Sequence, residues 1–322
     1  MEKKYDVIGM SLSCVDILNR IPAMPPVNTG APILQYSTQG GGKVASGIVA
    51  SARLGAKCAF ITVLGDCPNG KFMLQDFKDH GIDTSHIIID EGKESAISVV
   101  LSDDATHSRT IFHYPGTARK YTPADFSKEL IASARILHIS DCSDASFQAA
   151  KWAKESGVKV LIDADKYTPE LDEMIHYIDY FIASEFYYES KFQGQGSYEE
   201  NARKLKAEGP EVVLFTLGEK GVVGVDETDS YFEVEGFSVE AVDTTGAGDV
   251  YHGAYAYAAL QEDWTTPQRA RFCNAVSAIK CTRMGGRAAI PTREVALRFI
   301  ETGEIDYSEI DQRVERYRRI GV

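Results

Sequence analysis

The sequence predicts an α/β fold in which helices cover both faces of a mostly parallel sheet. Short apolar runs of strand length alternate along most of the chain with longer segments whose apolar residues recur at helical spacing. This alternation is typical of β-α-β units and of a sheet buried on both faces. The 322 residues suit one large domain of this class or two small ones, and we expect a single domain over residues 1–322.

The strands and helices are expected to follow one another in a regular order. A strand at 5–10 precedes a helix at 41–56, which glycines open and Gly55 closes. A strand at 57–65 and a helix at 69–81 form the next unit. Further strands are expected at 134–140, 158–164, 177–184 and 211–218. Further helices are expected at 144–157, at 197–209, from about Asp249 onward and at 306–322.

Two segments interrupt this rhythm. Residues 20–38 contain four prolines and are expected to be extended rather than helical. Residues 86–114 indicate a small antiparallel set of strands, because apolar and polar residues alternate around 97–101. We expect the two segments to form a small β lid beside the main domain. The alternative is a β excursion with no role in binding.

Composition argues against nucleic acid and membranes as partners. The net charge is −13, from 34 basic and 47 acidic residues, and such a surface repels phosphate backbones and anionic lipids. We find no signal peptide and no apolar run of about 18 residues that would span a bilayer. The six cysteines form no C-x-x-C pair, so reduced thiols and a cytoplasmic location are expected.

The stretch DTTGAGD, residues 243–249, is a candidate anion site. Small residues let backbone N–H groups converge, and the first N–H groups of a helix have no partner within it. Asp249 would then be either the helix N-cap or a base that takes a proton from an alcohol while the turn holds a phosphoryl group. The chain has no G-x-x-x-x-G-K-[ST] loop and no well-placed G-x-G-x-x-G, so a nucleotide would be bound in another way.

Residues 40–56 and 243–260 resemble the two signatures of the ribokinase-like (PfkB) carbohydrate kinases. The resemblance extends along most of the chain and is nearest in wording to the branch that contains sulfofructose kinase. Its further segments are 9–18, 63–83, 215–225 and 272–291. The resemblance implies a ribokinase-like sheet flanked by helices and the ATP-dependent phosphorylation of a hydroxyl on a small sugar.

The resemblance also implies roles for individual residues. Asp249 would be the base, and Gly246, Ala247 and Gly248 would form the anion hole. The expected sugar-binding residues are Asp16, Gly41, Gly42, Lys43, Ser46, Arg109, His113 and Asp141. The expected nucleotide-binding residues are Thr216, Gly218, Gly221 and Asn274. The alternative for Lys43 is a solvated lysine at a helix start, and the alternative for Asn274 is a polar helix residue.

Metal ions complete what the resemblance implies. Asp243 and Thr245 match positions that bind a monovalent cation in potassium-dependent relatives, with backbone carbonyls from residues 283–289. Magnesium would arrive on ATP. Two departures from the family pattern bear on these expectations. Ser46 stands where ribokinase has Asn. The usual N-x-x-E motif is replaced by residues 184–187, which lack the motif's Asn and Glu but include Glu185 beside that position.

The expected substrate is a neutral ketose, pentose or polyol. The segment 140–146 contains no arginine to pair with an acidic sugar, and Arg109 and His113 are the nearest candidates. A nucleoside kinase of the same fold and a sugar or nucleotide sensor without catalysis are the alternatives. We also expect a homodimer through the lid strands, because an exposed β edge favours pairing.

Overall fold

The computed structural model describes residues 3–106 and 108–319. Within these residues, nine strands form one sheet in the order β13-β12-β11-β10-β9-β8-β1-β4-β5. All neighbours pair in parallel except β11 with β12 and β12 with β13, which are antiparallel. The strands are β1 Tyr5–Met10, β4 Cys58–Gly65, β5 Ile87–Asp90, β8 Ala134–Ile139, β9 Lys159–Ala164, β10 Tyr180–Ser184, β11 Val212–Thr216, β12 Val222–Val225 and β13 Tyr231–Val234. The expected mostly parallel α/β fold is confirmed.

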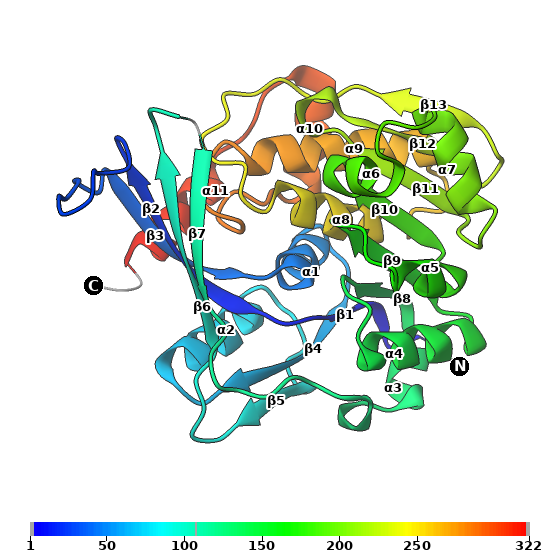
Figure 1. Cartoon of the computed structure of the whole chain (residues 1–322), viewed down its shortest axis with the longest axis horizontal. Helices are drawn as coiled ribbons and strands as arrows, with labels where there is room; N and C mark the ends of the chain where they lie inside the picture. Colours follow the sequence, from blue (N-terminus) through cyan, green and yellow to red (C-terminus); the bar gives the residue numbers. More distant parts are fainter. Residues whose placement is uncertain (1–2, 107, 320–322) are drawn as a thin grey trace.

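Helices cover both faces of this main sheet (Figure 1). Successive residues of β1 point to opposite faces, so Val7 belongs to one buried apolar cluster and Ile8 to the other. The Val7 side is covered by α1 Lys43–Arg53, α2 Pro68–Asp79, α8 Ala247–Ala258, α9 Thr266–Lys280 and α10 Arg293–Thr302. The Ile8 side is covered by α3 Lys128–Ala132, α4 Asp144–Glu155, α5 Leu171–Met174, α6 Glu185–Phe192 and α7 Tyr198–Lys206. The last helix, α11 Ser308–Arg319, lies against β3 of the small sheet described below.

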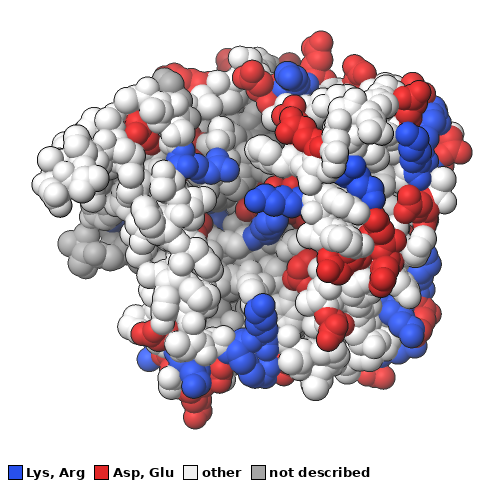
Figure 2. All heavy atoms as spheres, in the orientation of Figure 1, with Lys and Arg blue, Asp and Glu red and all other residues white. Residues whose placement is uncertain are grey.

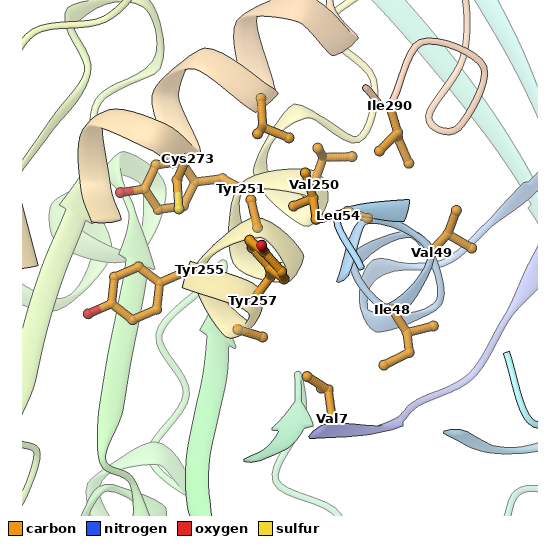
Figure 3. Packing of buried hydrophobic residues seen from close by; sticks show 14 of the residues in the cluster. Val7, Ile48, Val49, Leu54, Val250, Tyr251, Tyr255, Tyr257, Cys273 and Ile290 are labelled. Atoms are coloured by element: carbon orange, nitrogen blue, oxygen red, sulfur yellow. The ribbon is translucent and has the colours of Figure 1, made fainter. Parts of the chain in front are cut away.

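Helices α1 and α8 pack together through glycine. A methyl group on Gly253 would lie 1.9 Å from the carbonyl oxygen of Gly47, and one on Gly47 would lie 2.7 Å from His138. Ser51 bridges the same crossing, since its hydroxyl donates to the Gly253 carbonyl at 2.7 Å. Side chains such as Ile48 and Val250 pack around the contact (Figure 3). The N-terminal ends of two helices 200 residues apart in sequence are thereby placed in one region.

A second, small sheet has the strand order β3-β2-β6-β7. Three residues join β1 to β2, so the small sheet starts at the carboxyl end of β1, an interior strand of the main sheet. Strands β2 and β6 pair in parallel, and the two outer pairs are antiparallel. The strands are β2 Cys14–Ile21, β3 Gln35–Gly41, β6 Ala96–Asp103 and β7 Ser108–Tyr114.

The structure corrects several details of the expected lid and helices. Residues 87–90 were expected in the antiparallel set, but they form β5 and pair with β4 at the edge of the main sheet. The small sheet instead takes in Cys14–Ile21, and the proline segment connects β2 to β3. Helix α8 starts at Ala247 rather than Asp249, and the final residues of the expected helix at 306–322 lie outside the described residues. The sequence of a short apolar strand does not indicate which of two sheets the strand joins.

Across the residues that the structure describes, none of the helices combines the length and the apolar character required to cross a bilayer.

Gly253→Ala is expected to destabilise the protein by about 1–3 kcal/mol, because the added methyl group must push α1 and α8 apart. Chemical denaturation of the variant and the parent measures this difference. Gly30→Ala is the matched control, since a methyl group there meets no atom within 4 Å. Equal stability of the two variants would show that the helices do not depend on the glycine contact.

Candidate active site

A glycine turn, Gly246, Ala247 and Gly248, leads into helix α8. Gly246 precedes the helix with a left-handed backbone, φ 75° and ψ 9°. The Ala247 N–H donates to the Thr244 carbonyl at 3.1 Å. The N–H groups of Gly248 and Asp249 donate to no carbonyl among the described residues. Because these free donors lie at the positive end of the helix dipole, the turn suits an anion.

Asp249 is not the N-cap of α8. Gly246 holds that position, and Asp249 is the third residue of the helix. Burial first, and the negative charge of Asp163 second, raise the pKa of Asp249 to about 7. The positive charges of His252 and Lys43 act in the opposite direction. A carboxyl group with such a pKa can exchange a proton near neutral pH.

His252 lies one turn further along α8 and was not expected from the sequence. One ring nitrogen lies 2.6 Å from the Gly248 carbonyl and the other 3.1 Å from the Ile182 carbonyl. Both carbonyls are acceptors, so a ring N–H of His252 can donate to either of them. The Asp163 carboxylate lies 3.6 Å from the same ring. Asp163 stands at the end of the apolar segment 158–164, and this position is the sequence signal that would have pointed to it.

Asp16 lies against the backbone of the neighbouring strand. A methyl group on Gly41 would come within 2.2 Å of the Asp16 carboxylate, so only glycine leaves room for this acid. The Cys14 thiol donates to Asp16 at 3.3 Å. Burial is the main cause that raises the pKa of Asp16 above its usual value, although the charge of Arg287 lowers it in part.

The start of α1 brings three expected residues to the same place. Gly42 precedes the helix with φ 99°, a conformation that favours glycine, and a methyl group there would meet the Leu12 carbonyl at 2.8 Å. Lys43 pairs with Asp165 at 3.1 Å. Lys43 is therefore not simply a solvated lysine at a helix start. Ser46 is buried on the following turn of the helix.

The other expected sugar-binding residues are more dispersed. Arg109, on β7, donates to the Thr244 hydroxyl at 3.2 Å and so connects the small sheet to the segment that precedes the glycine turn. His113, on the same strand, lies 3.2 Å from the Ser98 hydroxyl. Asp141 is bonded to its own surroundings, where it accepts from Ser143, Ser146 and Tyr121. It lines neither of the two cavities described next.

The larger cavity, of about 640 Å³, lies between the glycine turn and the β11–β12 edge of the main sheet. All four expected nucleotide-binding residues line it, namely Thr216, Gly218, Gly221 and Asn274. Ala247 and Gly248 line the same cavity, so the residue that carries the free Gly248 N–H is part of its wall. The Asn274 amide donates to the carbonyls of Val234 and Glu235, at 3.2 and 3.0 Å. The N–H donors of the Asn274 amide are therefore used in hydrogen bonds within the cavity wall.

A second cavity, of about 350 Å³, lies under the small sheet. Gly42 and His113 line it together with Arg119 and Lys120. Arg119 forms a bidentate pair with Asp125, with both contacts at 2.7 Å, which neutralises its charge. Figure 2 shows Lys and Arg side chains along the hollow between the small sheet and the main body, while both signs of charge are mixed over the rest of this face.

Asp243 is held tightly by the loop that follows α9. Its carboxylate oxygens accept from the Thr245 N–H at 2.8 Å and the Gly285 N–H at 2.9 Å. Burial alone would raise the pKa of Asp243, but the Lys280 ammonium and these donors outweigh it and the pKa lies below its usual value. The Thr245 hydroxyl is buried and has no hydrogen-bond partner among the described residues.

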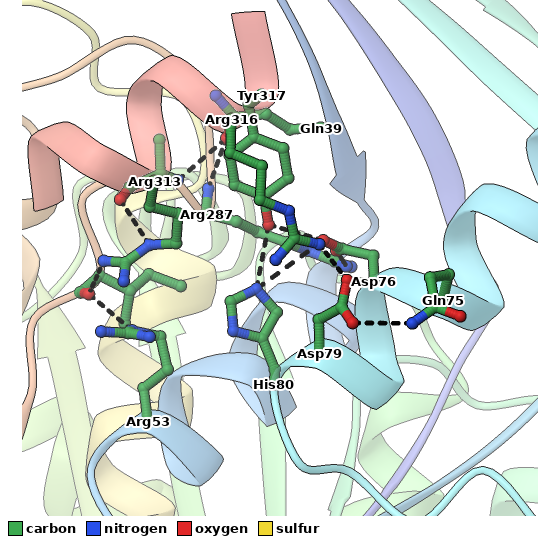
Figure 4. Close-up of polar contacts among 12 residues, drawn as sticks. Gln39, Arg53, Gln75, Asp76, Asp79, His80, Arg287, Arg313, Arg316 and Tyr317 are labelled. Carbon is green, nitrogen blue, oxygen red and sulfur yellow. Dashed lines mark hydrogen bonds and ion pairs between the residues drawn. The ribbon is translucent and has the colours of Figure 1, made fainter. Parts of the chain in front are cut away.

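Polar contacts join the small sheet to the same loop (Figure 4). The Gln39 amide donates to the Met284 carbonyl at 2.8 Å and accepts from the N–H groups of Arg287 and Ala288. The buried Arg287 guanidinium pairs with the buried Asp76 carboxylate at 2.6 Å and stands where a side chain on Gly40 would be. Sequence reasoning missed this network, because its members are scattered over the whole chain.

Oxygen ligands for a metal are also present. Glu185 and Asp165 directly follow the carboxyl ends of β10 and β9. Ser184 caps helix α6, since its hydroxyl accepts from the Tyr187 N–H, and this accounts locally for the altered N-x-x-E segment. Among residues 3–106 and 108–319, no group of three or more His, Cys, Asp or Glu side chains could hold a metal ion on its own.

Comparison with known proteins gives consistent matches over nearly the whole chain. A family model described as pfkB family carbohydrate kinase matches residues 10–293. Ribokinase of Haemophilus influenzae is 32% identical over 281 residues, covering 83% of this chain and 89% of that protein. The 5-dehydro-2-deoxygluconokinase of Geobacillus kaustophilus is 29% identical over 322 residues, covering 93% of this chain and 95% of that protein.

Solved structures share the fold. Ribokinase from Thermotoga maritima superposes with a TM-score of 0.80 at 24% identity, covering 92% of this chain and 100% of that chain. A ribokinase from Arabidopsis thaliana, complexed with ribose and ATP, also has a TM-score of 0.80, at 21% identity and with 94% and 99% coverage. The small sheet and the main sheet therefore belong to an architecture found in solved ribokinases.

Proposed function

The chain belongs to the pfkB family of carbohydrate kinases, and on this premise we propose how its cleft binds and phosphorylates a sugar. It is a sugar kinase that takes its phosphoryl group from ATP. The position of the α8 N-terminus carries the proposal. Ala247 and Gly248 line the larger cavity, while Lys43 and Asp16 act electrostatically on Asp249. ATP in the larger cavity and a sugar beside the small sheet would meet at the start of α8.

Asp249 is the base in this proposal. Its carboxylate takes the proton of the acceptor hydroxyl, and the free N–H groups of the turn stabilise the negative charge on the phosphoryl group in transfer. The pKa of about 7 supports this role, because half of such groups are ionised at neutral pH. The His252 ring, 3.6 Å from the Asp163 carboxylate, lies one turn beyond the base on the same helix.

The sugar would be held by the small sheet and the start of α1. Asp16 can accept two sugar hydroxyls, and the backbone at Gly41 and Gly42 allows close approach. Lys43, whose ammonium pairs with Asp165, would add a donor. Arg109 closes the entrance through its bond to Thr244, which is why we propose that the small sheet acts as a lid.

A neutral ketose, pentose or polyol is the proposed substrate class. Arg119, the arginine of the smaller cavity, is already neutralised by Asp125. A sugar with an acidic group is the second candidate, because Lys120 lines the same cavity and has no ion-pair partner among the described residues. A nucleoside remains the alternative on the same fold.

A panel of neutral sugars, sugar acids and nucleosides, followed by ADP release, tests the substrate class. Neutral sugars are expected to give the highest kcat/KM, and Lys120→Ala is expected to change it by less than about threefold. A preference for sugar acids that Lys120→Ala abolishes would select the second candidate. Turnover on nucleosides alone would contradict both.

ATP is proposed to bind in the larger cavity with magnesium on its phosphates. Gly218 and Gly221 line the cavity and have positive φ angles of 60° and 98°, which favour glycine. Since glycine has no side chain, neither residue fills the cavity. The carboxylates of Asp165 and Glu185 fit a magnesium ion, which prefers oxygen ligands and keeps several waters. The ion would neutralise charge on the phosphates during transfer.

The small sheet is also the proposed dimer surface. Every residue of β7 is exposed, and Ile111 and Phe112 have 51% and 56% of their surface accessible. Tyr36 on β3 is another exposed apolar residue of this sheet. Because an exposed apolar sheet with free edges favours pairing, a second copy of this chain is the proposed occupant.

The cytoplasm is the proposed location. All six cysteines are free, as expected in a reducing compartment. ATP is available there.

Asp249→Asn is expected to lower kcat about 10²–10⁴-fold while ATP binding is kept, because the amide cannot take the proton. The parent's kcat/KM should rise with pH and level off above about 7. As a control for folding, the variant should be the more stable protein at alkaline pH. At alkaline pH the parent carries an ionised, buried carboxylate, which lowers its free energy of unfolding. This loss of stability disappears below the unfolded-state pKa of about 4. Turnover within a few-fold of the parent would refute the assignment.

Phe112→Asp is expected to convert the dimer into a monomer, because a charge in the apolar lid surface is costly to bury. Sedimentation at micromolar concentration measures the change. Phe186→Asp is the control, since Phe186 is 66% exposed on α6, away from the small sheet. A parent protein that is already monomeric would contradict the dimer.

A further inference from the structure

The cation loop implied by the resemblance is already occupied by protein donors. Its expected ligands are Asp243, Thr245 and the carbonyls of residues 283–289. Both carboxylate oxygens of Asp243 accept from backbone N–H groups, of Thr245 and Gly285. An ion at this carboxylate would compete with two short hydrogen bonds.

The loop carbonyls are also engaged. The Met284 carbonyl accepts from the Gln39 amide at 2.8 Å, and the Ala288 carbonyl accepts from the Arg313 guanidinium at 2.8 Å. Figure 4 labels Arg313 together with Arg287 of the loop, whose guanidinium pairs with Asp76. Protein donors therefore already use two of the carbonyls that a monovalent cation would need.

Lys280 supplies a further positive charge inside the loop. It is the last residue of α9 and is 0% exposed. Its ammonium donates to the Asp243 carbonyl at 2.8 Å. A potassium ion bound to the same oxygens would lie next to this ammonium in a buried site, where like charges repel strongly. The residues present do not fit a bound monovalent cation.

Helix α9 connects this ammonium to the glycine turn. Lys280 holds the carbonyl of Asp243, whose carboxylate holds the Thr245 N–H just before Gly246. Ser277, three residues earlier on the same face of α9, donates to the Ala247 carbonyl at 2.7 Å. Two side chains of one helix thus fix the turn at both of its ends.

We propose that Lys280 is the resident cation of this kinase: its ammonium takes the place of the monovalent ion beside the glycine turn, so that catalysis requires no potassium. This inference rests on the proposed role of the glycine turn as the anion hole. Lys280 acts as a positioning residue, since it touches the turn through Asp243 and not the substrate.

The first test uses the parent protein. Turnover is measured in potassium chloride and in tetramethylammonium chloride, and the two rates are expected to agree within about twofold. A tenfold or greater activation by potassium would overturn the proposal. Such an effect corresponds to a decrease of about 1.4 kcal/mol in the activation free energy. This test stands even if every variant at position 280 fails to fold.

The second test is Lys280→Ala, which removes the ammonium and opens space at the Asp243 carbonyl. Turnover in tetramethylammonium chloride is expected to fall at least about tenfold, and potassium should restore part of it. Lys206→Met is the matched control, because Lys206 also donates to two backbone carbonyls but lies on α7. The control should show no response to potassium.

Thermal unfolding gives a readout that does not need activity. Potassium is expected to raise the Tm of Lys280→Ala, because an ion that binds only the folded state stabilises it, and to leave the parent unchanged. A folded variant whose turnover and Tm both ignore potassium would overturn the proposal. If no compound on the substrate panel is turned over, the proposed function fails, and the Tm comparison still decides whether Lys280 replaces the ion.

Discussion

The contact between Gly47 and Gly253 is the constraint on which the site depends. It lets α1 and α8 cross at backbone distance, so that the two helix starts converge. Gly42 and Lys43 then stand at one start, and the glycine turn and Asp249 at the other. His138 lies directly beneath this crossing with both ring nitrogens unpaired among the described residues, and burial holds its pKa well below the usual value.

The small sheet is placed by polar contacts as well as by apolar ones, such as the buried cluster of Leu18, Val100 and Met284. Burial of the Arg287–Asp76 ion pair costs desolvation free energy, which offsets the attraction between the two charges. The pair therefore contributes by fixing how the two side chains lie relative to each other. Through Gln39 the same arginine loop is bound to β3, and through Gly285 it is bound to Asp243. The small sheet and the glycine turn are therefore connected through one loop.

Much of the fold was predictable from sequence, because strand and helix periods are local. The first strand, Tyr5–Met10, has the expected bounds, whereas the apolar run at 87–90 was assigned to the wrong sheet. The glycine turn was found because its composition is unusual. The bond from Lys280 to Asp243, which joins residues 37 positions apart, could not be predicted, since only the packing of α9 brings them together. For the same reason the sequence did not show that the Asn274 amide is used within the cavity wall.

The central claim is that α8 presents the base and the anion hole between a sugar under the lid and ATP in the larger cavity. A crystal structure of the complex with a sugar substrate and a non-hydrolysable ATP analogue measures this directly. The account predicts that an Asp249 carboxylate oxygen lies about 3 Å from the acceptor hydroxyl, with the terminal phosphate on the N–H groups of the turn. A sugar bound elsewhere, or a terminal phosphate that does not touch the turn, would contradict it.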